Sequence, residues 1–396
     1  MAAVHKKSAA RANARIPVTL VTGFLGSGKT TMINAALRAP EMGKTVVVVN
    51  EFGEVGLDHQ LVTSSSDQVM VLENGCLCCT VRSDLVGTLN GLYHDRAAGR
   101  IPEFNHVVIE SSGLAEPGPI LQAFLSEPTL DGLYRVATVI TLVDVVNWKG
   151  TAERHDEALR QVAFADTVLL TKLELAADAA GAEAAARADI TDLNPEAEIL
   201  PIDLSPKFVA SLLTAPGFDA ADPTADPRPW LKLSRHLDAQ HHDHEHDHGH
   251  DHDHDHHHDH DHSGHDAHYH LRGKGVESFV LMRETPLSRE ELSFLLDGIS
   301  QNLGSGLLRV KGLVNIAGEP DKPAVIQGAQ HLLHTMTWLE RWPDDDHRTR
   351  IVFITQGITG RELREIVELL DRVGQRTFKA REKAKLLEEA SKRLAG

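Results

Sequence analysis

The sequence predicts an α/β protein in which a mainly parallel sheet covered by helices is followed by a smaller α+β domain. Three features support this prediction. Short apolar runs alternate with helical patterns, a glycine-rich loop follows the first run, and a tract of alternating histidine and aspartate separates the two halves. We expect these divisions: a basic tail over 1–15, the sheet domain over 16–215, a linker over 216–272, the second domain over 273–372 and a charged tail over 373–396.

The first apolar run, Ile16 to Val21, is typical of a buried strand and leads into a phosphate-binding loop. That loop is Gly23-Phe24-Leu25-Gly26-Ser27-Gly28-Lys29-Thr30-Thr31, which satisfies G-x-x-x-x-G-K-[ST]. Its glycines let backbone N–H groups surround a β-phosphate, Lys29 neutralises the outer oxygens, and Thr30 offers its hydroxyl to Mg²⁺. A glycine-rich turn alone gives no reason for Lys29 and Thr30. We therefore predict a nucleoside triphosphatase with a P-loop.

Further apolar runs alternate with helical patterns and predict the remaining strands of a parallel sheet. They are Thr45 to Val49, Val69 to Leu72, His106 to Ile109, Val136 to Val143, Thr167 to Leu170 and Glu198 to Ile202.

Carboxylates follow two of these strands. Glu110 ends the run Val107-Val108-Ile109, where it can orient Mg²⁺ or a bound water. Glu51 and Glu54 follow another strand within residues 50–58, which we interpret as a switch segment. Taken alone, Glu51 and Glu54 are more often ordinary surface carboxylates, so their assignment depends on the motifs around them.

All three cysteines of the chain lie in Cys76-Leu77-Cys78-Cys79. Thiols this close together strain a disulfide, and no other cysteine can serve as a partner. Thiolates are preferred ligands of Zn²⁺, so we predict a zinc site, against the alternative of a buried or chance cluster.

The linker carries a second set of metal-ligand residues between His241 and His270. This stretch has almost no apolar side chains and cannot form a core. Neutral imidazoles bind Zn²⁺, Ni²⁺, Cu²⁺ and Co²⁺, and neighbouring aspartates favour cations. We therefore expect many weak, exchangeable sites, against the alternative of a solvated spacer or a tag, at residues such as His248, His250, His252, His254 and His256.

The second domain begins with a strand at Val276 to Met282. Two capping boxes, Ser288 with Glu291 and Thr359 with Glu362, each precede apolar residues at helical spacing. Other expected strands are Leu307 to Ile316, Ala324 to Gln327, His334 to Leu339 and Arg350 to Ile354.

Composition narrows the class of protein. The net charge of -17 argues against a general nucleic-acid binder, and no run of apolar residues is long enough to predict a membrane span. The few cysteines do not form a disulfide framework, which favours a reducing, cytoplasmic location. The basic first 15 residues are more typical of a disordered tail than of a transit peptide.

Four motifs in order, GFLGSGKTT, NEFGE, NGCLCC and ESSGLAEP, resemble those of the CobW-like metal-chaperone GTPases of the SIMIBI class. The resemblance extends over nearly the whole chain, since that family also carries a histidine-rich linker and a similar carboxy-terminal domain. It implies that Gly26 to Thr31 bind the phosphates of GTP and that Glu51 and Glu110 serve the Mg²⁺ side. It also implies that Cys76, Cys78 and Cys79, assisted by Glu54, hold a metal for a client metalloprotein.

The guanine-reading segment of that family is usually Asn, Thr or Ser, then Lys, any residue, and Asp. Here it is Thr171-Lys172-Leu173-Glu174. Glu174 can accept the guanine N–H groups as aspartate does, but its extra methylene must be accommodated. The resemblance therefore implies GTP as the nucleotide, and Glu174 leaves the stringency of guanine selection open.

The combined expectation is a GTP-hydrolysing zinc chaperone whose metal affinity depends on the bound nucleotide. The residues leave alternatives open: a cobalt chaperone acting in cobalamin synthesis or nitrile hydratase activation, a metal store or sensor with negligible turnover, or a small-molecule kinase with a structural metal. They also leave the general base, the client and a homo-oligomer undetermined.

Overall fold

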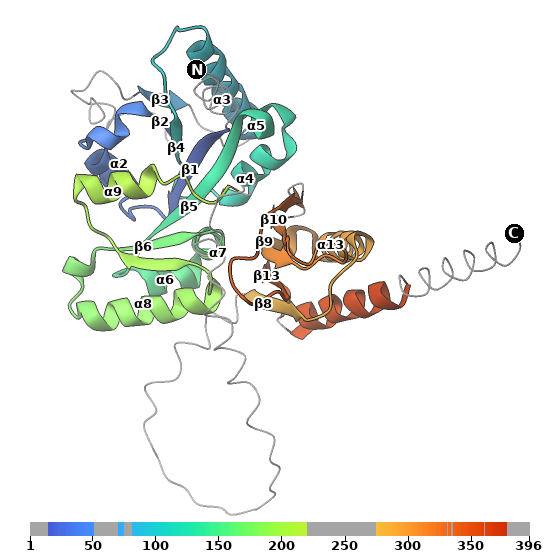
Figure 1. Ribbon diagram of the computed structural model, residues 1–396. Helices are drawn as coiled ribbons and strands as arrows, with labels where there is room; N and C mark the ends of the chain where they lie inside the picture. Colours follow the sequence, from blue (N-terminus) through green and yellow to red (C-terminus); the bar gives the residue numbers. More distant parts are fainter. Residues whose placement is uncertain are drawn as a thin grey trace, which may run out of the picture.

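The computed structural model describes residues 15–50, 70–74, 81–219, 275–330, 332–333, 336–359 and 361–377. Figure 1 shows a large sheet with helices on both faces and, beside it, a smaller sheet with its own helices. This arrangement confirms the predicted fold class, a P-loop sheet followed by a smaller α+β domain. In the described ranges, no helix has the apolar length that crossing a bilayer requires.

The large sheet has seven strands in the order β3-β2-β4-β1-β5-β6-β7, and each neighbouring pair is parallel. All the apolar runs expected in this half form strands. Their bounds are β1 Ile16–Gly23, β2 Thr45–Asn50, β3 Met70–Asn74, β4 His106–Glu110, β5 Tyr134–Asp144, β6 Thr167–Thr171 and β7 Glu198–Pro201. Because all strands point the same way, their carboxyl ends meet at one edge.

Alternate side chains of the central strands pack on opposite faces. Val18 and Leu20 of β1 contact one helical layer, whereas Val21 contacts the other. The Val21 face is covered by α2 (Lys29–Ala36) and α9 (Pro206–Leu213). The opposite face carries α3 (Val81–Ala97), α4 (Pro117–Ser126), α5 (Pro128–Leu133), α6 (Trp148–Arg154), α7 (Asp156–Ala163) and α8 (Ala179–Leu193). Short 3₁₀ turns lie at η1 (Pro40–Lys44) and η2 (Leu173–Leu175).

The second sheet has six strands and is antiparallel throughout. Its strands are β8 Val276–Arg283, β9 Leu307–Val314, β10 Ala324–Ala329, β11 Leu332–Leu333, β12 Thr337–Trp338 and β13 Thr349–Gln356. Within the strand expected at His334 to Leu339, the described residues form β12 at Thr337–Trp338. The strand expected to end at Ile316 ends at Val314.

Both predicted capping boxes form. Ser288 accepts the Glu291 N–H at 3.1 Å, and the Glu291 carboxylate accepts the Ser288 N–H at 2.7 Å, at the start of α13 (Arg289–Leu303), which the 3₁₀ turn η3 (Gly304–Gly306) follows. Thr359 and Glu362 make the same reciprocal bonds before the helix over residues 361–377. These helices cover one face of the second sheet, where Leu292, Leu295 and Leu363 are buried.

The other face of this sheet packs against the first domain. Val276, Ala329 and Ile354 belong to the same apolar cluster as α7 and α8. At this joint, Asp166 accepts hydrogen bonds from Arg309 and Lys311, each at 2.6 Å, and from the Val139 N–H at 2.9 Å. Burial alone raises the pKa of Asp166, but the two cations outweigh that effect and hold it well below its usual range. A buried ion cluster therefore fixes the two domains together.

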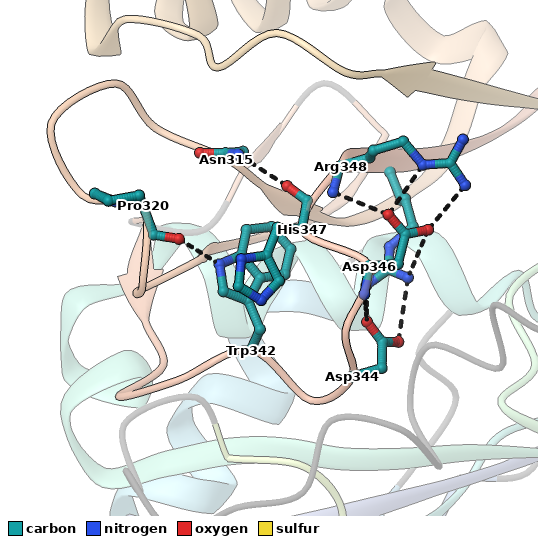
Figure 2. A network of polar contacts seen from close by, with 8 residues as sticks. Asn315, Pro320, Trp342, Asp344, Asp346, His347 and Arg348 are labelled. Carbon is teal, nitrogen blue, oxygen red and sulfur yellow. Dashed lines mark hydrogen bonds and ion pairs between the residues drawn. The ribbon is translucent and has the colours of Figure 1, made fainter.

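A polar network fixes the loop that leads into β13 (Figure 2). Trp342 donates to the Pro320 carbonyl at 2.8 Å, and its ring stacks on His347 with centroids 4.9 Å apart. Asp344 accepts two bonds from Arg350, at 3.2 and 3.1 Å. Trp342 also joins a small apolar cluster on which Phe218, near the end of the first domain, packs. The loop thus anchors the chain where the first domain ends.

Candidate functional site

The P-loop connects β1 to α2 at the carboxyl edge of the large sheet. Gly28 precedes the helix with φ 98°, a left-handed conformation that favours glycine. The Lys29 ammonium lies over the loop and donates to the carbonyls of Gly23 at 2.8 Å and Phe24 at 3.3 Å. The amino end of α2 and the Lys29 charge therefore face the same space, as an anion site requires.

Glu110 lies beside the P-loop because β4 is the parallel neighbour of β1, with Val21 opposite Glu110. The Thr30 hydroxyl donates to the Glu110 carboxylate at 2.8 Å. Glu110 is only 4% exposed, so this carboxylate is held in place. Hydroxyl and carboxylate oxygens are ligands that Mg²⁺ accepts, and the two predicted Mg²⁺-side residues are thus in contact.

The loop over residues 111–116 follows Glu110 and packs on the tip of the P-loop. A Cβ on Gly113 would lie 2.8 Å from the backbone of Leu25, so only glycine fits there. The Ser111 N–H donates to the Val21 carbonyl at 2.9 Å. Movement of the P-loop and movement of residues 111–116 are therefore coupled by direct contact.

The predicted guanine-reading segment lies at the end of β6. The Thr171 hydroxyl donates to the Ser27 carbonyl at 2.9 Å, which ties this strand to the P-loop. Lys172 has φ 62°, an uncommon conformation for a residue with a side chain. Glu174 is exposed in η2, and no hydrogen bond of its side chain is seen among the described residues. The segment therefore lies next to the P-loop, at the carboxyl edge of the sheet.

Asp144, which ends β5, pairs with Lys172 at 2.7 Å. Burial alone raises the pKa of Asp144, but hydrogen bonds from Lys172 and Asn147 and the charge of Lys172 together hold it below its ordinary value. Asp144 therefore stays ionised at neutral pH and holds Lys172 of the predicted guanine-reading segment.

A cavity of about 360 Å³ lies between the P-loop, the end of β5 and helices α6 and α7. Phe24, Ser27, Trp148 and Gln161 are among its lining residues. The Ser27 hydroxyl and the Gln161 side-chain oxygen are buried and have no hydrogen-bond partner among the described residues.

The sequence analysis did not single out Gln161 or Asp144. Two signals in the sequence could have found them. Asp144 stands at the end of an apolar run, and Gln161 follows Ala158 at helical spacing.

The remaining predicted site residues lie outside the described residues. They are Glu51, Glu54, Cys76, Cys78, Cys79, His248, His250, His252, His254 and His256. The strand β2 ends at Asn50 and β3 ends at Asn74, and these two residues are parallel partners at the carboxyl edge of the sheet. Among described residues, no group of three or more His, Cys, Asp or Glu could hold a metal ion.

Comparison with known proteins supplies relatives over most of the chain. Residues 17–201 match the CobW/HypB/UreG nucleotide-binding domain, and residues 276–370 match the cobalamin synthesis protein CobW C-terminal domain. The zinc chaperone YjiA of Escherichia coli is 30% identical over 349 residues, covering 88% of this chain and 96% of that protein. The zinc-regulated GTPase metalloprotein activator 1 of Dictyostelium discoideum is 28% identical over 346 residues, covering 78% of this chain and 64% of that protein.

Solved structures agree with the sequence matches. The Zn(II)-bound YjiA GTPase from E. coli has a TM-score of 0.58 and 26% identity to this chain, covering 90% of this chain and 99% of that one. The chain therefore belongs to the CobW/HypB/UreG family.

Proposed function

We propose that this protein hydrolyses GTP and uses that cycle to bind zinc at Cys76, Cys78 and Cys79 and to pass it to a client metalloprotein. The observation that carries the proposal is the 2.8 Å bond between Thr30 of the P-loop and Glu110 of the adjacent strand end. It joins two groups that nucleotide hydrolysis needs beside Mg²⁺. The names of two relatives, a zinc chaperone and a zinc-regulated GTPase metalloprotein activator, support the choice of zinc and GTP.

We assign the phosphates of GTP to Gly23 and to Gly26 through Thr31, where glycine conformations, the Lys29 ammonium and the α2 amino end favour an anion. Thr30, Glu110 and Glu51 are assigned to the Mg²⁺ side. When bound, Mg²⁺ neutralises charge that develops on the phosphate oxygens. The chain's own part is to hold Lys29 at the phosphates and to keep Glu110 oriented through its bond with Thr30.

We assign guanine recognition to Thr171, Lys172 and Glu174. Thr171 positions the segment through its bond to the Ser27 carbonyl, and Asp144 holds Lys172. Glu174 would accept from the ring N–H and the exocyclic amine, as Asp does in relatives of the usual pattern. Its longer side chain is exposed, so it must be ordered on binding, and this costs affinity.

Zinc is the cargo in this proposal. The ends of β2 and β3 lie at the same edge of the sheet as Glu110. In the sequence, Glu51 and Glu54 come after β2 and Cys76 comes after β3. We infer that GTP orders residues 51–58 and so changes the affinity of the nearby thiolates for zinc. Three thiolates leave a fourth position for Glu54, water or a ligand of the client, which suits transfer.

We also assign weak zinc binding to His248, His250, His252, His254 and His256, which would raise the local concentration of the metal. The thiolates need a reducing compartment to stay available, so we place the protein in the cytoplasm.

The test is zinc affinity, measured by competition with a chromophoric chelator, with Mg²⁺·GTP, with Mg²⁺·GDP and without nucleotide. We expect the GTP form to bind one zinc about tenfold more tightly than the GDP form, within the usual range of coupling energies of roughly 1 to 3 kcal/mol. The Cys78→Ser variant should lose that site and the nucleotide effect. Equal affinity in all three states would favour a storage or structural role for the cysteines.

A further inference from the structure

One arginine of the first domain contacts both the loop over residues 111–116 and the second domain. Arg160, on α7, forms an ion pair with Glu116, the last residue of that loop. The same guanidinium donates to the Gln356 side-chain oxygen at 2.5 Å, and Gln356 ends β13 of the second domain. Glu116 occupies the position before α4 but makes no side-chain cap there, so its carboxylate is used on Arg160.

The neighbouring residue on α7 holds the same loop. The Gln161 side-chain amide donates to the carbonyls of Gly113 at 3.1 Å and Ala115 at 3.0 Å, and Gln161 is 1% exposed. Two successive residues of one helix therefore contact the loop at three points. Because Gln161 is buried and Arg160 is also bonded to Gln356, the conformation of the loop depends on where α7 and β13 lie.

The second domain also contacts the helix that follows the loop. Gln330, in the turn after β10, bonds to Gln122 of α4, and a Cβ on Gly118 would lie 2.6 Å from its amide nitrogen. The orange domain in Figure 1 lies beside α4 and α7, in agreement with these contacts. Both the end of the loop and the helix after it are thus in contact with the second domain.

We propose that Arg160 is a positioning residue through which the docked carboxy-terminal domain holds residues 111–116 in place for GTP hydrolysis. This inference rests on the proposed GTPase function. The loop directly follows Glu110 and contacts Leu25 of the P-loop, so its order sets the order of the phosphate end of the site. A loop that is already held does not lose conformational freedom when the reaction begins, which raises the rate of the chemical step.

The test is a Gln356→Leu variant of the full chain, which removes the side-chain oxygen that accepts from Arg160. We expect its kcat for GTP to fall about five- to tenfold, as the loss of one typical hydrogen bond suggests, with KM changed less than about twofold. The matched control is Gln327→Leu, which makes the same change on β10 at the domain joint, away from the loop. It should keep the wild-type kcat.

A double-mutant cycle separates this role from a general loss of stability. If Gln356 acts through Arg160, the kcat of Arg160→Gln should not fall further when Gln356→Leu is added. The control ion pair is Arg187 with Glu183, whose side chains are 37% and 32% exposed, against 32% and 30% for Arg160 and Glu116. Arg187→Gln should leave kcat unchanged. Additive losses from Arg160→Gln and Gln356→Leu would contradict the proposal.

Hydrogen exchange of peptides covering residues 111–116 decides the proposal without any turnover. These amides should exchange several-fold faster in Gln356→Leu than in either the wild type or Gln327→Leu. Unchanged exchange and unchanged kcat in Gln356→Leu would overturn the role of Arg160. Absence of GTP hydrolysis by the wild type would instead overturn the proposed function, and exchange alone would then decide the inference.

Discussion

The carboxyl edge of the parallel sheet and the joint between the domains both pair carboxylates with cations, but they do so differently. At the edge, Asp144 holds Lys172, whose side chain is still 32% exposed. At the joint, Asp166 is enclosed by Arg309, Lys311 and a backbone N–H, and the Lys311 side chain is only 5% exposed. A partly exposed pair can exchange partners with a ligand, whereas separating a buried pair leaves its charges without solvation. The first arrangement suits binding, and the second suits a permanent contact.

The largest effect should come from breaking the joint. Asp166→Ala leaves Arg309 and Lys311 buried without their shared carboxylate, so we expect the free energy of unfolding to fall by about 3 to 5 kcal/mol. Denaturant titration of the full chain measures it. The control is Asp131→Ala, which removes an exposed partner of Arg15 and should cost less than about 1 kcal/mol. If Asp166→Ala lowers the free energy of unfolding by as little as Asp131→Ala does, the ion cluster at the joint contributes little to stability.

Breaking the edge should affect activity rather than stability. Lys29→Ala removes the charge that we assign to the phosphates, and we expect kcat/KM for GTP to fall at least about a hundredfold, or roughly 3 kcal/mol of transition-state stabilisation. Steady-state phosphate release measures this, and thermal unfolding should show little change. Retained turnover would mean that the P-loop is not where GTP reacts.

His106, at the opposite edge of the sheet, is a buried titratable group that has no carboxylate partner among the described residues, so it shows the effect of burial without charge pairing. His106 contacts the Thr19 hydroxyl at 2.9 Å, and that hydroxyl gives its proton to the Leu213 carbonyl, so the His106 ring nitrogen donates. Burial, with a smaller contribution from Arg135, lowers the pKa of His106 to about 4. The unfolded chain therefore binds a proton that the folded chain does not between about pH 6.5 and pH 4.

The sign follows from that difference. The contribution of His106 to stability is fully present above pH 6.5 and is lost as pH falls toward 4. The loss of stability reaches about 2 to 3 kcal/mol at pH 4. Unfolding free energies measured between pH 7 and pH 4 should therefore fall less steeply for His106→Gln than for the wild type. The exposed His94→Gln is the control and should follow the wild-type slope. Parallel slopes for all three proteins would contradict this assignment.

The smallest effect concerns the exposed end of the site. Glu174→Asp restores the usual guanine-reading residue, and we expect the preference for GTP over ATP in kcat/KM to rise by about three- to tenfold, since one hydrogen-bond geometry improves. Glu183→Asp, on α8, makes the same change outside the segment and is the matched control. A fall in selectivity for Glu174→Asp would mean that this segment has adapted to the longer side chain.

Local patterns in the sequence predicted most of the first domain. Each parallel strand begins within two residues of its apolar run, because a strand buried on both faces leaves a continuous apolar signature. The contact between Thr30 and Glu110 fits the prediction that both serve the Mg²⁺ side, since Thr30 follows the P-loop after β1 and Glu110 ends the neighbouring strand β4. Both capping boxes followed from spacing alone.

The domain joint could not be predicted in the same way. Asp166 lies 143 residues before Arg309, and nothing local to either indicates the other. The same holds for Arg160 and Gln356, 196 residues apart, whose contact depends on how the second sheet docks. Tertiary contacts of this kind carry no periodicity, so the sequence supplies the elements but not their partners.

The most direct test of the account is the affinity of a non-hydrolysable GTP analogue for the full chain, with and without zinc. Because coupling is reciprocal, the factor by which zinc tightens the analogue must equal the factor by which the analogue tightens zinc. We predict a factor of about ten in both directions in the wild type and none in Cys78→Ser. Analogue affinity that is the same with and without zinc in the wild type would contradict nucleotide-linked metal transfer.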